Sequence, residues 1–215
     1  MDTLIQAYEY ATSPSSDFWG AVGTHLQLSF VALFIAGLIG IPLGIFVSRY
    51  NLLAQLSINV MGIVRVIPSL ALLFLLIPIL HTGFVPSATA LTVLAIPPLL
   101  INTEAGMRGV SKPVIEAGRG MGMTYWQLLW KVQLPLALPV ILAGVRIATV
   151  EVIASATLAS IIGGGGLGDF ITAGLARGRN SILLVGAIPV AIIALLAEVG
   201  LSYLQRMVVR RQHGV

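Results

Sequence analysis

Long stretches with few or no charged side chains run through this sequence, and they restrict its fold more than any other feature. A helix of about 20 apolar residues crosses the roughly 30 Å hydrocarbon core of a membrane. Because that core holds no water, backbone N–H and C=O groups must pair within the chain, which only helices and closed barrels achieve. The sequence does not show the apolar–polar alternation typical of barrel strands. We therefore predict an all-α integral membrane protein.

Composition agrees with this prediction, because only 9% of the residues are charged and 57% are hydrophobic. Soluble domains carry about 25% charged residues. We expect an N-terminal segment at 1–25, a transmembrane domain at 26–205 and a basic tail at 206–215. The five expected transmembrane helices are 26–47, 59–80, 86–105, 136–162 and 181–203. Pro97 and Pro98 are expected to bend or break the third of them.

The distribution of basic residues predicts the orientation in the membrane. With the N-terminus outside, eight Lys and Arg residues of the loops and tail lie on the cytoplasmic side and two lie outside. Cytoplasmic loops carry the excess of Lys and Arg in membrane proteins. The polar loop at 106–135 and the C-terminus are therefore predicted to be cytoplasmic.

Segment 116–135 is the polar stretch with the most specific pattern. Ser111 followed by Pro113 predicts a helix start, with Glu116 in the first turn. Gly122 permits a sharp turn, and the amphipathic run 126–132 predicts a second helix that stops at Leu134-Pro135. The pattern predicts a short helix, a turn and a second helix leading back to the membrane.

This segment resembles the cytoplasmic loop in permease subunits of bacterial ABC importers. That loop carries Glu-Ala-Ala, then Gly, then Ile-x-Leu-Pro at the same spacing, and Gly118 and Val132 are the two departures here. The resemblance implies the type I ABC importer permease fold and a short helix that fits a groove in a cytoplasmic ATPase. An ordinary polar connector is the alternative. The ATPase-coupling residues that it implies are Glu116, Ala117, Gly118, Gly122, Val132, Leu134 and Pro135.

The glycine-rich stretch after the fourth expected span carries a second resemblance. Gly163, Gly165 and Gly168 fit the dinucleotide pattern G-x-G-x-x-G formally, but that fingerprint requires a preceding strand. We expect these glycines to end the span and to form a hinge. The stretch IGGGGLGDF, together with RVIPSLA from Arg65 and GFVP from Gly83, resembles the osmoprotectant branch, the permeases for glycine betaine, choline and carnitine. Methionine-type amino-acid permeases share the layout and remain an alternative.

Polar residues inside the fourth expected span are candidates for the transport pathway or gate. A charge at the bilayer centre costs roughly 3 kcal/mol or more, so it needs a partner or water. Arg146 and Glu151 lie five residues apart, about 140° around one helix, which argues against pairing within the span. A structural ion pair and close helix packing are the alternatives. The candidates are Arg146, Thr149, Glu151, Ser155, Ser160, Gly163 and Gly165.

The resemblance also implies the partners. They are a dimer of cytoplasmic ABC ATPases that bind ATP and Mg, an extracytoplasmic solute-binding protein, and a second copy of this chain in a homodimer. We expect a multi-pass protein of the bacterial inner membrane, surrounded by lipid, with no cofactor, metal or nucleic acid bound by this chain and no enzymatic activity of its own. An ion-coupled secondary transporter is a rival, but its inverted repeats are not seen in the sequence. A membrane enzyme would require a catalytic set, and none is evident.

Overall fold

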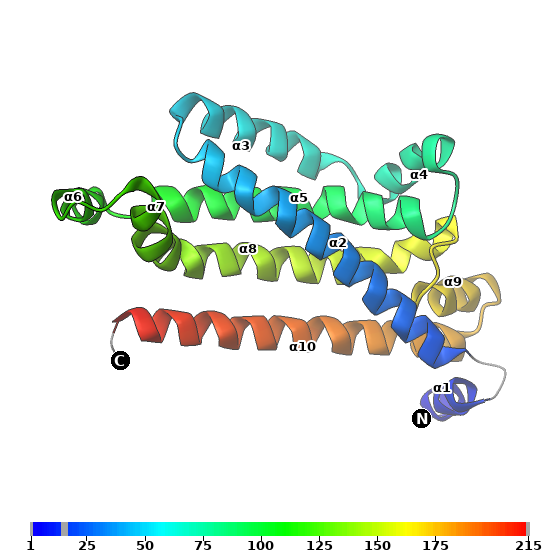
Figure 1. The fold of residues 1–215 in the computed structure, drawn as a ribbon. Coiled ribbons are helices and arrows are strands. Elements are labelled where there is room, and N and C mark those ends of the chain that lie inside the picture. Colours follow the sequence, from blue (N-terminus) through cyan, green and yellow to red (C-terminus); the bar gives the residue numbers. More distant parts are fainter. Residues whose placement is uncertain (1, 14–16, 214–215) are drawn as a thin grey trace. The chain divides into compact units, whose positions relative to one another are not determined.

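The computed structural model describes residues 2–13 and 17–213, and every regular element in these residues is helical (Figure 1). The elements in chain order are α1 (Asp2–Thr12), α2 (Phe18–Val47), α3 (Asn51–Val66), α4 (Ser69–Leu80), α5 (Phe84–Arg108), α6 (Lys112–Gly120), α7 (Tyr125–Leu128), a π-helical turn η1 (Leu129–Gln133), α8 (Leu134–Ser155), a 3-10 helix η2 (Ala156–Ile162), α9 (Gly168–Ala176) and α10 (Asn180–His213).

Among the described residues, four helical segments are long and apolar enough to cross a membrane: α2, α5, the run Tyr125–Ile162 and α10. Helices α3 and α4 meet this test only as a pair, bent by 90° at their junction. The expected span 59–80 is therefore two helices rather than one. The break follows from Pro68, which has no N–H to donate and disfavours helical backbone at the preceding residue. The described chain thus has four candidate spans, or five if the bent pair counts as one.

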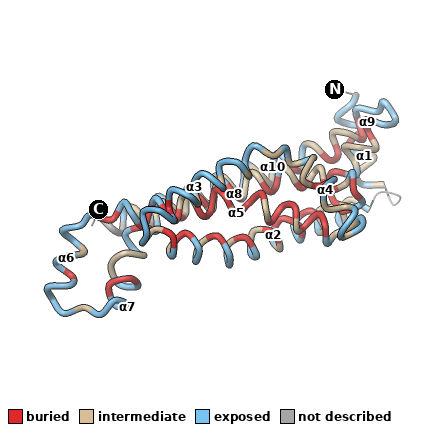
Figure 2. The backbone as a smooth tube through the Cα atoms, turned by 90° about the horizontal axis from the view of Figure 1, so that it is seen from above, coloured by how far each residue is buried: buried red, intermediate tan, exposed pale blue. Residues whose placement is uncertain are grey.

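Helix α5 is the most buried of the candidate spans (Figure 2). Its most apolar window is 67% buried, whereas those of the other three are 22% to 33% buried. Pro97 and Pro98 are fully buried in α5, and the helix continues through them, so the expectation of a break is wrong. Close packing explains this, because a Cβ atom added at Gly144 of α8 would lie only 2.8 Å from the Pro98 carbonyl oxygen.

Residue contacts divide the chain into two compact units. The first comprises Met1–Ile35, Ile67–Ala95 and Thr149–Glu198, and the second comprises Ala36–Val66, Ile96–Ala148 and Val199–Val215. Helices α2, α5, α8 and α10 each contribute residues to both units.

Small residues bring the helices of the second unit close together. A Cβ atom at Gly44 of α2 would lie 2.6 Å from the Thr103 Cβ atom of α5, and one at Gly144 would lie 2.6 Å from the Asn102 Cβ atom. Membrane helices commonly pack through such small residues, because backbones must approach closely for dispersion forces to act. Both α2 and α8 are thus packed tightly against α5 within this unit.

The first unit contains the glycine-rich stretch and α9. Gly163 ends the 3-10 helix in a left-handed conformation with φ of 75°. The Gly83 N–H group donates a 2.8 Å hydrogen bond to the Ile162 carbonyl group, which joins the α4–α5 connection to the end of η2. The Phe170 ring of α9 meets the Tyr10 ring of α1 edge to face, at a centroid distance of 6.3 Å. These contacts pack α1, α9 and the glycine-rich stretch into one unit.

Candidate functional site

The short helix expected at the start of segment 116–135 is α6, in the second unit. It begins at Lys112, after extended backbone at Ser111, with Pro113 in its first turn. Glu116 is the fifth residue of α6 and lies beyond the first turn, so its expected position was wrong. The first-turn N–H groups of a helix have no intrahelical partner, which lets Pro113 occupy the second position, and the predicted helix start at Ser111 and Pro113 is found.

Helix α6 ends in a Schellman motif centred on Gly122. The Met123 N–H group donates to the Gly118 carbonyl group at 3.2 Å, and the Gly122 N–H group donates to the Arg119 carbonyl group at 2.9 Å. Gly122 has φ of 76°, the left-handed conformation that this motif requires. The sharp turn expected at Gly122 is confirmed.

A capping box begins the second helix of the segment. The Thr124 N–H group donates to the Gln127 side-chain oxygen at 2.9 Å, and the Gln127 N–H group donates to the Thr124 hydroxyl oxygen at 3.4 Å. This pair was not predicted, although Thr-x-x-Gln before an apolar run is a recognised helix-start pattern. The cap orients α7 directly after the turn.

Gly118 lies where α6 meets α7. It is buried, and a Cβ atom at this position would lie 2.7 Å from the Leu128 Cδ1 atom. Alanine, the residue of the resembling loops at this position, therefore does not fit unless Leu128 moves. Because Leu128 Cδ1 is the end of a flexible side chain, a small shift of Leu128 would accommodate alanine, whereas a larger side chain would disturb the packing of Leu128 against the α6 backbone.

The stop expected at Leu134-Pro135 is not found. The chain stays helical from Tyr125 through η1 into α8, with the Leu134 N–H group paired to the Leu129 carbonyl group. Within an α-helix, Pro135 would clash with the carbonyl group four residues earlier. The wider π-helical turn before Pro135 accommodates its ring without ending the helix.

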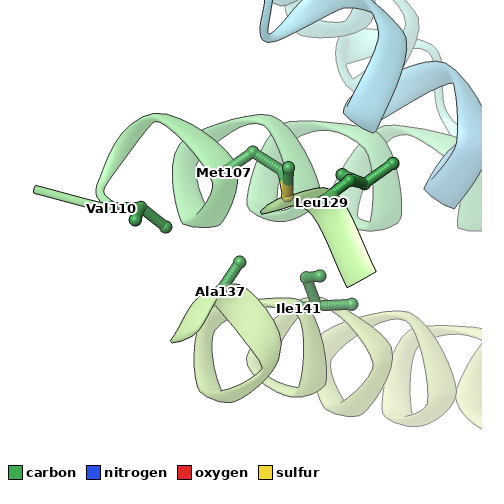
Figure 3. Packing of buried hydrophobic residues seen from close by; sticks show 5 residues of the cluster. All are labelled: Met107, Val110, Leu129, Ala137 and Ile141. Carbon is green, nitrogen blue, oxygen red and sulfur yellow. The ribbon is translucent and has the colours of Figure 1, made fainter. Parts of the chain in front are cut away.

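A cluster of buried apolar side chains connects the segment to the long helices of the second unit. Leu129 is 3% exposed and packs with Met107 in the last turn of α5, with Val110 just beyond that helix, and with Ala137 and Ile141 of α8 (Figure 3). Ile115 of α6 and Leu134 pack against the same cluster. Movement of the segment would therefore be transmitted to the ends of α5 and α8 within this unit.

Exposure divides the seven predicted coupling residues into two groups. Glu116, Ala117, Gly122 and Pro135 are exposed at the surface of the chain. Gly118 is buried against Leu128, Leu134 packs against the cluster around Leu129, and Val132 is half-buried. All seven lie in one helix–turn–helix, and the four residues of the first group are its exposed members.

Basic side chains lie beside this segment, and they are not among the predicted site residues. Arg108 lies 3.4 Å from the buried Glu104 carboxylate and donates a 2.8 Å hydrogen bond to the Asn51 side-chain oxygen. The Arg49 guanidinium lies over the Tyr125 ring, 4.5 Å from its centroid. The four-residue spacing of Glu104 and Arg108 could have predicted their ion pair, since it places both side chains on one helix face.

The predicted pathway residues are divided between the two units. Arg146 belongs to the second, where it lines a cavity of about 510 Å³ with Ser202, Gln205 and Arg206. The Gln205 side chain donates a 2.9 Å hydrogen bond to the Pro139 carbonyl group and joins α10 to α8 there.

The remaining candidates belong to the first unit. Thr149, Glu151, Ser155 and Ser160 are half-buried, and the Ser160 hydroxyl group donates to the Thr157 carbonyl group at 2.9 Å. Gly163 is exposed, Gly165 is half-buried, and both have φ of 75°. Their role in a pathway or gate stays a prediction.

The sequence of this chain is similar to those of known proteins. The sequence profile of the family described as binding-protein-dependent transport system inner membrane component matches residues 36–214. The carnitine transport permease protein OpuCB of Listeria monocytogenes is 47% identical, over 84% of this chain and 83% of that protein. The glycine betaine/carnitine/choline transport system permease protein OpuCB of Bacillus subtilis is 41% identical, over 86% of each.

One more permease and one solved structure are also similar to this chain. The carnitine transport permease protein OpuCD of Listeria monocytogenes is 39% identical, over 96% of this chain and 93% of that protein. A chain of the MetNI methionine ABC transporter, solved in an inward-facing conformation, superposes with a TM-score of 0.78. It is 25% identical, and the match covers 89% of this chain and 95% of that one.

Proposed function

The chain belongs to the family of binding-protein-dependent transport system inner membrane components, and from this premise we propose that segment 116–135 docks on a cytoplasmic ATPase while the helices carry a trimethylammonium solute. The chain is a permease subunit of an ABC importer in the bacterial inner membrane, a transport component rather than an enzyme. ATP use in such an importer belongs to a separate ATPase.

The exposed side of α6 is the observation that carries the docking proposal. Glu116 and Ala117 face outward, while Gly118 on the same helix packs against Leu128. Because α6 is packed on one face and exposed on the other, it can transmit the movement of a bound partner to α5 and α8 through the cluster around Leu129. We infer that closure of the ATPase dimer moves the ends of these helices. Rigid-body movement of subunits about an interface is a common form of switching in proteins.

A charge reversal on α6 tests the docking proposal. Glu116→Lys should sharply reduce co-purification of the ATPase, because it places a like-signed charge beside Lys112 and Arg119 and removes the exposed carboxylate. Glu9→Lys is the matched control, since Glu9 is an exposed glutamate on α1 in the other unit. Normal co-purification of the ATPase with the Glu116→Lys variant would refute docking through α6.

The solute proposal rests on the relatives. Glycine betaine, carnitine and choline all carry a trimethylammonium group, and proteins usually recognise it with aromatic side chains. The main aromatic residues of the apolar helices, Phe30, Phe34, Phe46 and Phe74, are 45% to 68% exposed rather than gathered around a buried site. We therefore assign selectivity to the solute-binding protein and conduction to this chain.

Uptake of radiolabelled solutes by cells or proteoliposomes that contain the complete importer tests this assignment. Carnitine, glycine betaine or choline should accumulate, and ATP depletion should abolish the accumulation. Methionine is the second candidate solute, because the MetNI chain shares the fold at 25% identity. Methionine uptake without betaine, carnitine or choline uptake would refute the first assignment, and uptake that survives ATP depletion would favour an ion-coupled mechanism.

We also propose that two permease chains together form the pathway, since one chain supplies a single docking segment. The expected homodimer stays a prediction. The two Listeria relatives favour an alternative, because two different proteins of that organism both carry the name carnitine transport permease and both resemble this chain. That alternative is a pair of two non-identical permeases.

A further inference from the structure

A basic cavity lies in the second unit and is bordered by the connection between α5 and α6. Its volume is about 540 Å³, and the α2–α3 turn, the end of α5, α6 and α7 contribute to its wall. Its lining includes four cationic side chains and, among the described residues that form it, no carboxylate. The four are Arg49, Arg108, Lys112 and Arg119.

Two of the four cations are held in place by contacts within the unit. Arg108 is held between Glu104 and Asn51, and Arg49 is held over the Tyr125 ring. The Lys112 and Arg119 side chains form no hydrogen bond or ion pair within the described part of the chain. Since Glu104 balances one cation, the lining keeps an excess of positive charge that an anion would stabilise.

The remaining wall and the adjoining helix identify the kind of anion. Met107, Val110 and Ile115 give the cavity an apolar side, which a small hydrated ion would not need. Helix α3 starts at the rim with Asn51, and three of its apolar side chains are exposed: Leu52 by 68%, Leu56 by 51% and Ile63 by 68%. An apolar strip thus runs away from a basic cavity, next to the ends of two candidate spans, α2 and α5.

We propose that this cavity binds the phosphate group of an anionic membrane lipid, with the acyl chains lying along the exposed apolar side chains of α3. The guanidinium and ammonium groups suit phosphate oxygens, because charge-assisted hydrogen bonds of this type are short and strong. Ser48, Asn51 and Gln133 offer neutral hydrogen-bonding groups for the remainder of the headgroup. A bound headgroup would connect α6 to the ends of α2 and α5. The inference does not depend on the identity of the solute or on ATPase docking.

Native mass spectrometry of the full-length permease in neutral detergent tests the proposal. The chain is incubated with phosphatidylglycerol or with phosphatidylcholine of the same acyl composition, and the retained lipid is counted. The wild type should retain phosphatidylglycerol in preference to phosphatidylcholine. The double variant Lys112→Gln, Arg119→Gln should bind phosphatidylglycerol at least about tenfold more weakly, since each basic side chain at a membrane surface contributes of the order of a few-fold in affinity.

A matched double variant controls for charge alone. Arg65→Gln with Lys131→Gln also removes one arginine and one lysine, both exposed and both in the second unit, and neither lines the cavity. It should retain phosphatidylglycerol like the wild type. Unchanged retention in the Lys112–Arg119 variant, or an equal loss in the control variant, would overturn the proposal.

Inorganic phosphate separates a lipid from a free anion. If millimolar inorganic phosphate displaces phosphatidylglycerol from the wild type, the cavity is a site for a soluble anion and the lipid assignment fails. The variants are expected to fold, because Lys112 and Arg119 are exposed, and circular dichroism with size-exclusion chromatography verifies this. Should the double variant aggregate, the single variant Arg119→Gln is measured in the same way, with a loss of a few-fold expected.

Discussion

At the residue scale, Gly118 and Ala117 are adjacent small residues with opposite environments. Gly118 is buried against Leu128, whereas Ala117 is exposed. Gly118→Val should destabilise the α6–α7 packing by about 1–3 kcal/mol, the usual cost of overpacking, and should lower transport. Ala117→Val should leave the melting temperature of the purified permease nearly unchanged. Equal melting temperatures for the two variants would contradict the packing of Gly118 against Leu128.

Two glycines at the end of α6 give a second test at this scale. Gly122→Ala should cost about 1 kcal/mol or more, because an alanine at φ of 76° is strained. Gly120→Ala should be neutral or stabilising, since Gly120 is helical and a Cβ atom there would meet nothing within 4 Å. Thermal unfolding of the two variants measures the difference. A lower melting temperature for Gly120→Ala than for Gly122→Ala would rule out the Schellman turn.

At the element scale, the π-helical turn before Pro135 sets how α7 is oriented on α8. Pro135→Ala restores an N–H group and removes the clash that the wider turn accommodates. We expect the turn to become α-helical, which would rotate α7 by about 100° relative to α8 and move Leu129 out of its cluster. Transport should fall, while the chain remains helical.

A cross-link measures this rotation directly, because the chain contains no cysteine. Met107→Cys with Leu129→Cys introduces two thiols within one packed cluster. Oxidation should join them in the otherwise unchanged chain and should fail when Pro135→Ala is added. Equally efficient cross-linking in both backgrounds would show that Pro135 does not determine the orientation of α7.

At the scale of the whole molecule, the exposure of the helices and the names of the relatives raise the question of how many permease chains the importer contains and whether they are identical. The most apolar windows of α2 and α10 are only 28% and 22% buried within the chain, which leaves apolar surface for lipid and for a second permease. Two copies of this chain with different tags, expressed together with the ATPase, should co-purify if the importer is a homodimer. Recovery of a single tag, with a different permease chain present, would contradict the homodimer and support the pair of non-identical permeases.

Much of the candidate site was accessible from sequence because its signals are local. The spacing of Glu116, Gly122 and Pro135 marked the segment, and Gly122 predicted the turn that the structure confirms. The division into exposed and packed coupling residues was not accessible. It depends on where Leu128 lies relative to α6, and that position is a property of the folded segment.

The basic cavity shows the same limit over a longer range. Arg49 and Arg119 are 70 positions apart in the chain, and their shared environment arises only when the α2–α3 turn and α6 border one space. No spacing in the sequence predicts that two residues so far apart line the same cavity.

Hydropathy alone determined that this protein is an all-α membrane protein, because unpaired backbone groups are too costly in lipid for most other folds. Only the tertiary structure decided which prolines interrupt a helix. Pro68 is exposed and separates α3 from α4, whereas Pro97 and Pro98 are fully buried and α5 continues through them. Pro68 is the N-cap residue of α4, where a missing N–H group costs little, whereas Pro97 and Pro98 each remove a backbone hydrogen bond from the interior of α5. Close packing, such as that of Gly144 against Pro98, offsets this cost in α5.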